Sequence, residues 1–403
     1  MSTQFQDAEF QFGLELALGA AYHQAADVGE ALATADRITD GDCDSWLQEW
    51  IGTAEVCRDA AADAESKGRR VSALAYHRRA ATYYATALYR FAGASDNSRQ
   101  RELELWREQR ACWERTVDLM AVPGERIAIP YDGTTLNGFF FRAPDAEPGE
   151  RRPLVVMNNG SDGATSSMWI EGGAAAAERG CHWMTFDGPG QQAALYEQNI
   201  PFRHDWEAVL TPVLDAMLAR ADVDAEHVAL IGVSQAGYWV PRAIAFEHRF
   251  AAAVADGGVV DVSVSWIGNL PGPMKKQLRD GDRDAFDREM QAAEAAAPKA
   301  KATLDFRAKP YGINGGSRFD LFTAVAAYRL GDEVKNIRTP LLITDPDGEQ
   351  FFPGQPRQLY ELLTGPKELV RFTAREGAAG HCEPMARSLR ETRIFDWLEG
   401  YLA

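Results

Sequence analysis

Ser234 lies in a stretch whose residue types and spacing could present a nucleophile. An apolar run of strand length, residues 228–231, precedes it, and apolar positions at helical spacing follow it. Small residues flank the serine at Gly232, Ala236 and Gly237. This is close to Gly-x-Ser-x-Gly, in which a sharp turn between a strand and a helix lifts a serine oxygen above a sheet. We therefore expect Ser234 to attack a carbonyl carbon, with Ala236 as a departure from the motif.

A serine nucleophile also needs a base, and histidine can serve as one. The chain has seven histidines, and His248 and His381 follow the serine. Where a serine occupies this kind of turn, the acid follows it along the chain and the histidine comes last. His248 lies in a polar turn soon after the predicted helix, whereas His381 lies in a glycine-rich loop before the final predicted helix. We therefore expect His381 to act as the base.

The carboxylate that would orient this histidine has more than one candidate. The loop after the seventh predicted strand offers Asp345, Asp347 and Glu349. The usual form of this segment ends in Asp, any residue, two apolar residues and proline. Aligned without gaps, the acid position falls on Glu349, and residues 351–353 (Phe-Phe-Pro) take the last three positions. Because a glutamate can also accept the imidazole N–H, we expect Glu349 to orient His381, with Asp347 as the alternative.

Two backbone N–H groups are expected to stabilise the oxyanion that forms during attack. One belongs to Gln235, directly after the nucleophile, and the other to the Asn-Asn-Gly-Ser-Asp-Gly loop at residues 158–163. In that loop Gly160 permits the turn and Ser161 supplies the N–H. Asp162 either contacts substrate or caps the helix that follows. The candidate substrate contacts are Asp162, Trp239 and Phe351.

Strand and helix signals divide the chain into two predicted parts. Residues 1–122 are rich in alanine, contain no proline and carry almost no strand signal, which predicts an all-helical N-terminal domain that forms part of a cap. Residues 123–403 alternate apolar strands with helices, which predicts a catalytic domain with a mostly parallel sheet covered by helices on both faces. Between about residues 259 and 332 the alternation stops, and we expect a lid insertion there.

Three local signals add detail to this frame. Capping preferences predict a helix start at Asp44 or Ser45 and another at Asp205. Residues 187–191 (Asp-Gly-Pro-Gly-Gln) form a predicted turn that positions the oxyanion loop.

The composition is that of a globular protein and excludes several classes of partner. A net charge of −17 argues against nucleic acid and anionic membranes, and no apolar run approaches the roughly 20 residues of a membrane span. The five cysteines are scattered without C-x-x-C spacing, so we expect reduced thiols and no metal site. The first residues lack a leader pattern. We expect a cytoplasmic protein that acts on a small molecule without a cofactor.

Four motifs together resemble the α/β-hydrolases that carry a helical N-terminal domain. This group includes 2,6-dihydroxypseudooxynicotine hydrolase, the fermentation-respiration switch protein and fungal hydrolases that shorten a polyketide chain. The resemblance covers most of residues 125–403, and it departs from the family at Ala236 and at Gln192, where glycine is common. The motifs are Asn-Gly-Ser-Asp-Gly (159–163), Phe-Asp-Gly-Pro-Gly-Gln (186–191), Gly-Val-Ser-Gln-Ala-Gly (232–237) and Gly-Ala-Ala-Gly-His-Cys (377–382).

This resemblance implies an α/β-hydrolase fold whose N-terminal helices and insertion enclose the site, and a homodimer. It also implies a serine hydrolase that cleaves a carbon–carbon bond next to a carbonyl, or an ester, in an aromatic or polyketide-like compound through an acyl-enzyme. Two other hypotheses remain open. One is an acyltransferase or cyclase of natural-product biosynthesis on the same scaffold, and the other is a binding protein without catalytic activity.

Overall fold

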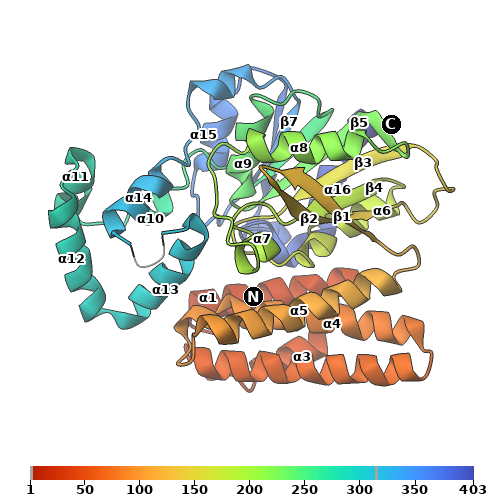
Figure 1. The fold of residues 1–403 in the computed structure, drawn as a ribbon, viewed down its shortest axis with the longest axis horizontal. Coiled ribbons are helices and arrows are strands. Elements are labelled where there is room, and N and C mark those ends of the chain that lie inside the picture. Colours follow the sequence, from red (N-terminus) through yellow and green to blue (C-terminus); the bar gives the residue numbers. More distant parts are fainter. Residues whose placement is uncertain (1–2, 314–315) are drawn as a thin grey trace.

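An eight-stranded sheet of order β1-β2-β4-β3-β5-β6-β7-β8 runs through the molecule (Figure 1). The computed structural model describes residues 3–313 and 316–403. The β1–β2 and β2–β4 pairs are antiparallel, and the remaining neighbours are parallel, as the alternation of strands and helices predicted. The strands are β1 Glu125–Tyr131, β2 Thr134–Phe141, β3 Arg152–Asn158, β4 His182–Phe186, β5 Val223–Val233, β6 Ala252–Asp256, β7 Leu341–Pro346 and β8 Lys367–Phe372.

Alternate residues of the central strands enter two cores, one on each face of the sheet. Along β3, Leu154 and Val156 belong to the first core, and Val155 and Met157 belong to the second. Burial on both faces explains why such strands are almost continuously apolar. Helices α8 and α9 contribute to the first core, and α6 and α16 to the second. The elements flanking the sheet are η3 Trp169–Gly173, α6 Ala174–Glu178, α7 Gln192–Tyr196, α8 Glu207–Leu218, α9 Ala236–Ile244, α15 Gln355–Leu362, η6 Ala374–Glu376, η7 Pro384–Ala386 and α16 Arg387–Leu402.

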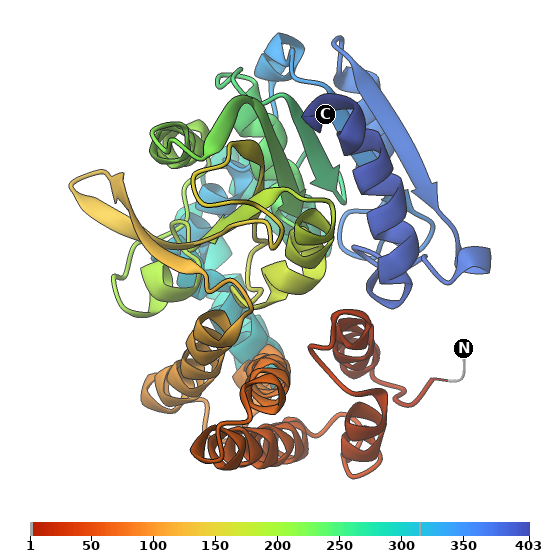
Figure 2. The ribbon, with the colours of Figure 1, turned by 90° about the vertical axis from the view of Figure 1, so that its right-hand side faces the viewer.

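The N-terminal helices share the second core with the sheet and lie beneath it in both ribbon views (Figures 1 and 2). The Trp113 ring of α5 lies 6.2 Å from the Phe141 ring of β2. Polar contacts cross the same boundary, since the His23 ring nitrogen Nε2 lies 2.6 Å from a carboxylate oxygen of Glu391. The helices are therefore packed continuously onto the sheet. They are α1 Ala8–Gly19, η1 Ala20–His23, α2 Val28–Ala35, α3 Cys43–Ser66, α4 Arg70–Tyr89, η2 Phe91–Gly93 and α5 Arg99–Leu119.

Two predicted helix caps are wrong by a few residues. The side chain of Asp42 caps α3 and accepts hydrogen bonds from the N–H groups of Asp44 and Ser45, which were the predicted caps. Asp42 is the cap because it lies directly before the first residue of α3, where its carboxylate reaches the unpaired N–H groups of the first turn. Asp205 caps no helix. Its carboxylate forms a salt bridge of 2.7 Å with Arg203, and α8 begins at Glu207 without a side-chain cap.

A helical insertion connects β6 to β7 and lies to one side of the sheet (Figure 1). It contacts both the loop before α8 and the N-terminal helices. The Phe202 N–H donates to the Pro310 carbonyl over 2.7 Å, and Lys309 pairs with the buried carboxylate of Glu102 on α5. Residues 314–315, within the predicted lid, lie outside the described residues. The insertion comprises α10 Val264–Ile267, α11 Gly272–Asp280, α12 Arg283–Ala296, α13 Pro298–Ala308, η4 Lys309–Tyr311, α14 Arg318–Ala326 and η5 Asp332–Asn336.

Within the described part of the chain, no helix combines the length and the apolar character that crossing a lipid bilayer requires.

Candidate active site

Ser234 occupies the turn between β5 and α9 in the left-handed backbone region, with φ of 59°. Two backbone hydrogen bonds hold this unfavourable conformation. The Ser234 N–H donates to the Asp256 carbonyl at the end of β6 over 2.9 Å, and the Gly237 N–H donates to the Ser234 carbonyl over 2.7 Å. The turn therefore fixes the serine oxygen at the carboxyl end of the central strands, as the sequence motif predicted.

Close backbone approach explains the small residues around the serine. A Cβ atom on Gly237 would lie 2.1 Å from the Gly257 carbonyl oxygen, and one on Gly232 would lie 2.4 Å from a Val240 methyl carbon. Glycine is required at both positions. Ala236, by contrast, is fully buried in the first core, so the turn accommodates this departure from the motif.

The structure brings Ser234, His381 and Glu349 into one hydrogen-bonded chain. His381 Nε2 lies 2.8 Å from Ser234 Oγ, and His381 Nδ1 lies 2.6 Å from Glu349 Oε2. The other oxygen of Glu349 accepts the N–H groups of Phe351 and Phe352 over 2.8 and 3.1 Å. Burial raises the pKa of Glu349, but the charge of His381 and these hydrogen bonds outweigh burial, so the pKa lies below its ordinary value. An ionised Glu349 can hold the imidazole in one orientation.

Asp347, the alternative acid, lies apart from this chain. Its carboxylate accepts from Arg371 over 2.6 Å and from the Ala374 N–H over 3.3 Å. Asp345 is bound to Arg357 over 2.9 Å. Of the three carboxylates in the loop, Glu349 therefore contacts the histidine.

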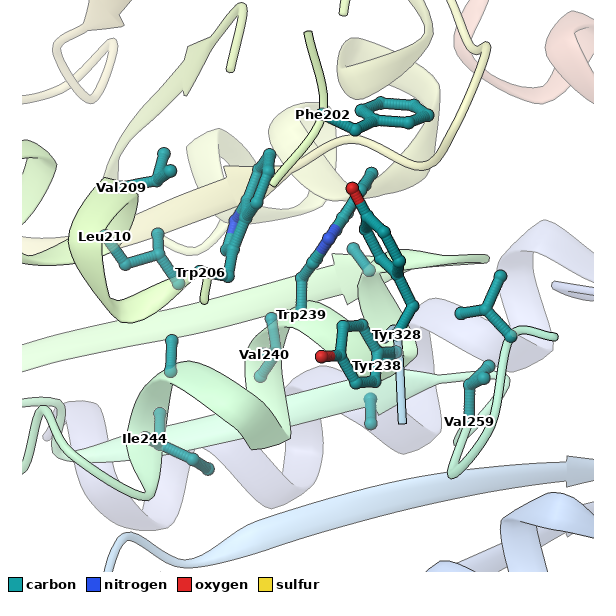
Figure 3. Close-up of a cluster of buried hydrophobic side chains, with 14 of the residues drawn as sticks. Phe202, Trp206, Val209, Leu210, Tyr238, Trp239, Val240, Ile244, Val259 and Tyr328 are labelled. Carbon is teal, nitrogen blue, oxygen red and sulfur yellow. The ribbon is translucent and has the colours of Figure 1, made fainter. Parts of the chain in front are cut away.

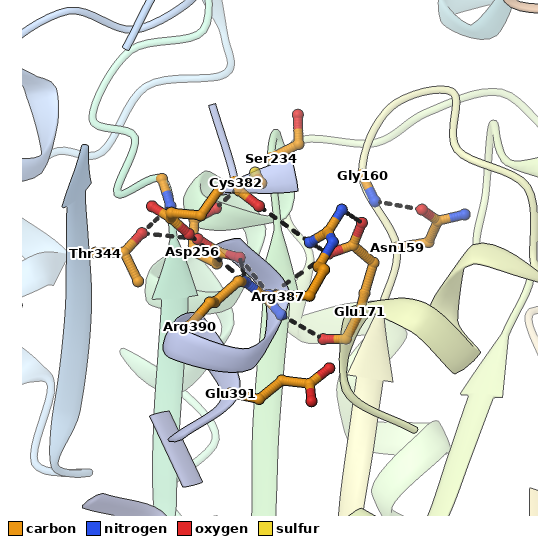
Figure 4. Close-up of polar contacts among 12 residues, drawn as sticks. Asn159, Gly160, Glu171, Ser234, Asp256, Thr344, Cys382, Arg387, Arg390 and Glu391 are labelled. Atoms are coloured by element: carbon orange, nitrogen blue, oxygen red, sulfur yellow. Dashed lines mark hydrogen bonds and ion pairs between the residues drawn. The ribbon is translucent and has the colours of Figure 1, made fainter. Parts of the chain in front are cut away.

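The predicted oxyanion loop approaches the nucleophile closely. A Cβ atom on Gly160 would lie 2.9 Å from the Ser234 Cβ. The Gly160 N–H itself donates to the Asn159 side chain over 2.8 Å (Figure 4). Among the described residues, the backbone N–H groups of Ser161 and Gln235 donate no hydrogen bond. Gly160 thus allows the loop to approach Ser234 but does not offer its own N–H. The N–H groups of Ser161 and Gln235 remain available to donate to a bound molecule.

Residues 187–191 form hydrogen bonds with the predicted oxyanion loop. The Gln191 side chain donates to the carbonyls of Asn159 and Gly160 over 2.8 and 2.6 Å. Asp187 accepts from Thr165 over 2.6 Å. These hydrogen bonds hold the backbone of residues 159–160 in place, so that it need not rearrange when negative charge develops on a substrate oxygen.

Gln192, the second departure from the family pattern, has a positive φ of 33°. Glycine adopts such a backbone most easily. Here the side chain makes two contacts that glycine could not make. It accepts from the indole N–H of Trp106 on α5 over 2.9 Å and donates to the Gly163 carbonyl over 2.8 Å. Gln192 therefore links the N-terminal helices to the oxyanion loop.

A buried network of charged side chains lies beneath Ser234 and the His381 loop (Figure 4). Asp256 accepts from Thr344 and Arg390, each over 2.7 Å. Burial raises the pKa of Asp256, but the charge of Arg390 and these hydrogen bonds outweigh burial and lower it. Arg390 also donates to the Glu171 carbonyl over 2.8 Å. Asp256, whose carbonyl accepts the Ser234 N–H, is therefore itself held by Thr344 and Arg390.

Glu383 belongs to this network and lies two residues after His381. It is fully buried, and its Oε2 lies 3.6 Å from Arg390 Nε. Burial and the nearby charge of Asp256 raise the pKa of Glu383 well above the ordinary range of glutamate. The raised pKa favours the protonated form of Glu383, which reduces the negative charge beside Asp256.

Aromatic residues of the N-terminal helices reach the histidine. The Phe12 ring of α1 lies 6.5 Å from the His381 ring and 5.7 Å from the Phe351 ring, and Tyr89 of α4 lies 6.3 Å from Phe12. Sequence reasoning missed Phe12 and Tyr89. Both stand among apolar residues at helical spacing, and nothing in that pattern separates a side chain of the site from a side chain of the core.

The three predicted substrate contacts have different surroundings. Phe351 is 37% exposed, and its ring lies 4.8 Å from the His381 ring. Asp162 is exposed and accepts from the Ser161 hydroxyl over 3.0 Å, and it caps no helix. Trp239 is fully buried and stacks 4.1 Å from Trp206 in the first core (Figure 3). Phe351 therefore lies beside His381, whereas Trp239 is part of the first hydrophobic core.

Among the described residues, no group of three or more histidine, cysteine, aspartate or glutamate side chains is arranged to hold a metal ion.

No family model matches the chain, but curated proteins are similar to it. It is 26% identical over 418 residues to the α/β-hydrolase psoB of Aspergillus fumigatus, covering 98% of this chain and 93% of psoB. It is 30% identical over 293 residues to the hydrolase acrC of Aspergillus aculeatus, covering 68% of each. It is 31% identical over 268 residues to the 20-hydroxy-prefusarin hydrolase FUS2 of Gibberella moniliformis, covering 65% of this chain and 63% of FUS2.

Solved structures share the fold. The crystal structure of 2,6-dihydroxy-pseudo-oxynicotine hydrolase superposes with a TM-score of 0.72 at 19% identity, covering 96% of this chain and 95% of that one. AbyA5 superposes with a TM-score of 0.61 at 18% identity, covering 98% and 99%. With the fold shared over nearly the whole length and acrC similar over two thirds of both sequences, the chain belongs to the α/β-hydrolase family and is an enzyme of that type.

Proposed function

We propose that the protein is a serine hydrolase that cleaves a carbon–carbon bond next to a carbonyl, or an ester, in an aromatic or polyketide-like small molecule. The observation that carries this proposal is the unbroken hydrogen-bonded chain from Ser234 Oγ through His381 to Glu349. A nucleophile, a base within hydrogen-bond reach and a carboxylate behind the base are the groups that acyl transfer requires.

In the proposed reaction, Ser234 Oγ bonds to the carbonyl carbon while its proton passes to His381 Nε2. Glu349 accepts the Nδ1–H and stabilises the imidazolium. The N–H groups of Ser161 and Gln235 stabilise the oxyanion. Collapse of the tetrahedral intermediate expels an alkoxide or a carbanion, which takes the proton from His381 and leaves an acyl-enzyme. Water, deprotonated by His381, then attacks the acyl-enzyme and releases the acid.

The names of similar proteins support the substrate class. One relative is named for 20-hydroxy-prefusarin, and one structural neighbour is named for 2,6-dihydroxy-pseudo-oxynicotine. Both names describe hydroxylated small molecules. Carbon–carbon cleavage also favours a leaving carbon whose negative charge is delocalised, as in a phenol or an enol.

The test compares wild-type protein with Ser234→Ala on a chromogenic short-chain ester and on a β-diketone. We expect the variant to lose turnover of both by about ten-thousand-fold or more. A fluorophosphonate probe should add its mass to the wild-type protein and not to the variant. Unchanged turnover in the variant would show that the serine mechanism is wrong.

Two alternatives give different outcomes in the same assays. An acyltransferase or cyclase would release an acylated or cyclised product, which product mass separates from an acid. The buried histidine and the neighbouring aromatic rings of Phe12 and Phe351 favour this alternative because they restrict water. A binding protein without activity would turn over neither substrate and resist the fluorophosphonate.

The proposal extends to the assembly and the cap. Residues 1–122 and the insertion at about 259–332 are proposed to enclose the site together, in a cytoplasmic homodimer. Light scattering after size exclusion would test the dimer, and a monomer mass would exclude it.

A further inference from the structure

Arg307, near the end of α13, is a cation without a carboxylate partner. Among the described residues, no carboxylate oxygen lies within 4.0 Å of its guanidinium. The guanidinium lies 4.6 Å over the Trp266 ring and 3.5 Å from the Ser265 hydroxyl. Arg318, by contrast, is paired with Glu294 over 2.5 Å. It lies beside a hollow of about 650 Å³ that α13 also lines.

Three segments of the site contribute groups that interact electrostatically with this exposed cation. They are Tyr311, Asp162 and Tyr89. Tyr311 belongs to the insertion, Asp162 to the oxyanion loop and Tyr89 to α4. Tyr89 in turn lies beside Phe12, which approaches the catalytic histidine. Because α13 also packs against η2 after α4, Arg307 lies where the insertion meets the N-terminal helices.

Two buried polar groups lie between Arg307 and the nucleophile. The Tyr311 hydroxyl and the Gln235 side chain lie close to each other, yet neither the hydroxyl nor the amide nitrogen makes a hydrogen bond of good geometry among the described residues. The two side chains are only 8% and 6% exposed. The Tyr311 ring packs 5.5 Å from Trp266, the ring beneath Arg307, and Gln235 directly follows Ser234. Buried donors are normally satisfied, and these two, beside the nucleophile, retain hydrogen-bonding capacity for a bound molecule.

We propose that Arg307, Tyr311 and Gln235 form a subsite for a planar anionic oxygen group of the substrate, either a carboxylate or an ionised enol. The proposal rests on the serine hydrolase function proposed above. A guanidinium presents a planar fork of donors that matches a delocalised anion, and Trp266 offers a flat surface beside it. Asp162 is exposed and bonded to Ser161, so it leaves Arg307 free to bind a ligand.

The kinetic test uses two p-nitrophenyl esters that differ at the far end of the acyl chain. One carries a carboxylate, and the other carries the corresponding primary amide. We expect Arg307→Gln to lower kcat/KM for the carboxylate ester by about 10- to 100-fold, the range of charge-assisted hydrogen bonds. The amide ester should react at the wild-type rate. Arg288→Gln, which removes an exposed arginine of α12, is the matched control and should change neither rate.

Two further variants separate recognition from folding. Arg307→Lys keeps the charge without the planar fork and should retain part of the preference for the carboxylate ester. Tyr311→Phe should weaken that preference without changing the amide ester. An equal loss for both esters in Arg307→Gln, or no loss for either, would overturn the subsite.

A binding measurement keeps this proposal separate from the serine mechanism. Calorimetry would compare benzoate with benzamide, and dimedone, which is ionised as an enolate at neutral pH, with its neutral enol ether. Wild-type protein and Ser234→Ala should both bind at least one anion more tightly than its neutral partner, and Arg307→Gln should lose that difference. Which anion is preferred identifies the carboxylate or the enolate. Equal binding of anions and neutral partners by the wild-type protein would exclude the subsite even if Ser234 is the nucleophile.

Discussion

Below Ser234 Oγ the buried charged side chains pair with one another, whereas above it Arg307 has no carboxylate partner among the described residues. We call the triad and the buried charges beneath it the floor. There His381 is held by hydrogen bonds to Ser234 and Glu349. We call the aromatic residues of α1 and α4, together with Arg307 and Tyr311, the roof. There the Tyr311 hydroxyl also makes no hydrogen bond of good geometry among the described residues.

This difference separates two tasks of one site. Reacting groups must be held before the substrate arrives, because catalysis depends on donors and acceptors that need no rearrangement. Groups that recognise a substrate must instead have unused hydrogen-bonding capacity, which the substrate then fills. If the proposed function holds, the floor carries the chemistry and the roof the choice of substrate.

The largest expected effect contrasts two carboxylates of the same loop. Glu349→Gln should lower kcat by up to about ten-thousand-fold, because the amide no longer favours the reactive orientation and charge of His381. Asp347→Asn is the matched control. It removes an ion pair with Arg371 at the surface, which contributes at most about 1 kcal/mol to stability, and should leave kcat unchanged. Steady-state kinetics of both variants on one ester measures which carboxylate activity depends on. Loss of activity in Asp347→Asn alone would reverse the assignment.

A methyl group at Gly160 should displace the predicted oxyanion loop from Ser234. Its Cβ would lie 2.9 Å from the Ser234 Cβ and 3.0 Å from the Val233 carbonyl oxygen. The loop must move away, and we expect Gly160→Ala to lower kcat by about 100-fold, as loss of an oxyanion donor does. Gly52→Ala in α3, where nothing lies within 4 Å of the added Cβ, is the control. Wild-type kcat in Gly160→Ala would mean that the loop takes no part.

Truncation of the roof should change binding more than chemistry. Phe12→Ala removes a ring beside His381 and Phe351, so KM for an aromatic ester should rise about tenfold while kcat changes little. Val71→Ala, an exposed position of α4, serves as the control. A loss confined to kcat would assign Phe12 to the floor.

The smallest effect concerns stability and comes from Glu383. Its pKa is raised in the folded protein, so the folded state keeps a proton that the unfolded chain releases as pH rises above the ordinary value of about 4.5. Wild-type stability should therefore fall as pH rises from that value toward the raised pKa. Glu383→Gln is neutral throughout, so its stability relative to wild type should increase over the same range.

Urea unfolding between about pH 5 and pH 8 measures this difference. Glu383→Ala is the companion variant, and it should be less stable than wild type because it leaves a cavity. A stability difference between Glu383→Gln and wild type that does not change with pH would show that Glu383 is ionised in the folded protein.

Much of the fold could be predicted because its signals are local. The sheet, the helices on its faces and the helical start of the chain follow from apolar runs and their spacing, and the α/β-hydrolase fold is confirmed. The predicted helix caps at Asp44 or Ser45 and at Asp205 were wrong because several acidic residues lie close together and only backbone geometry selects among them.

For the site, the sequence by itself singled out Ser234, His381 and the loop of Glu349, because a strained turn and a glycine-rich loop demand particular residue types at fixed spacing. The alignment of the loop already favoured Glu349 over Asp347, and the tertiary structure places Glu349 rather than Asp347 beside His381, since the contact depends on where the loop directs each carboxylate. It alone placed Phe12 beside His381 and Arg307 over Trp266. Their contacts join segments far apart in the chain, and such distances leave no pattern in the sequence.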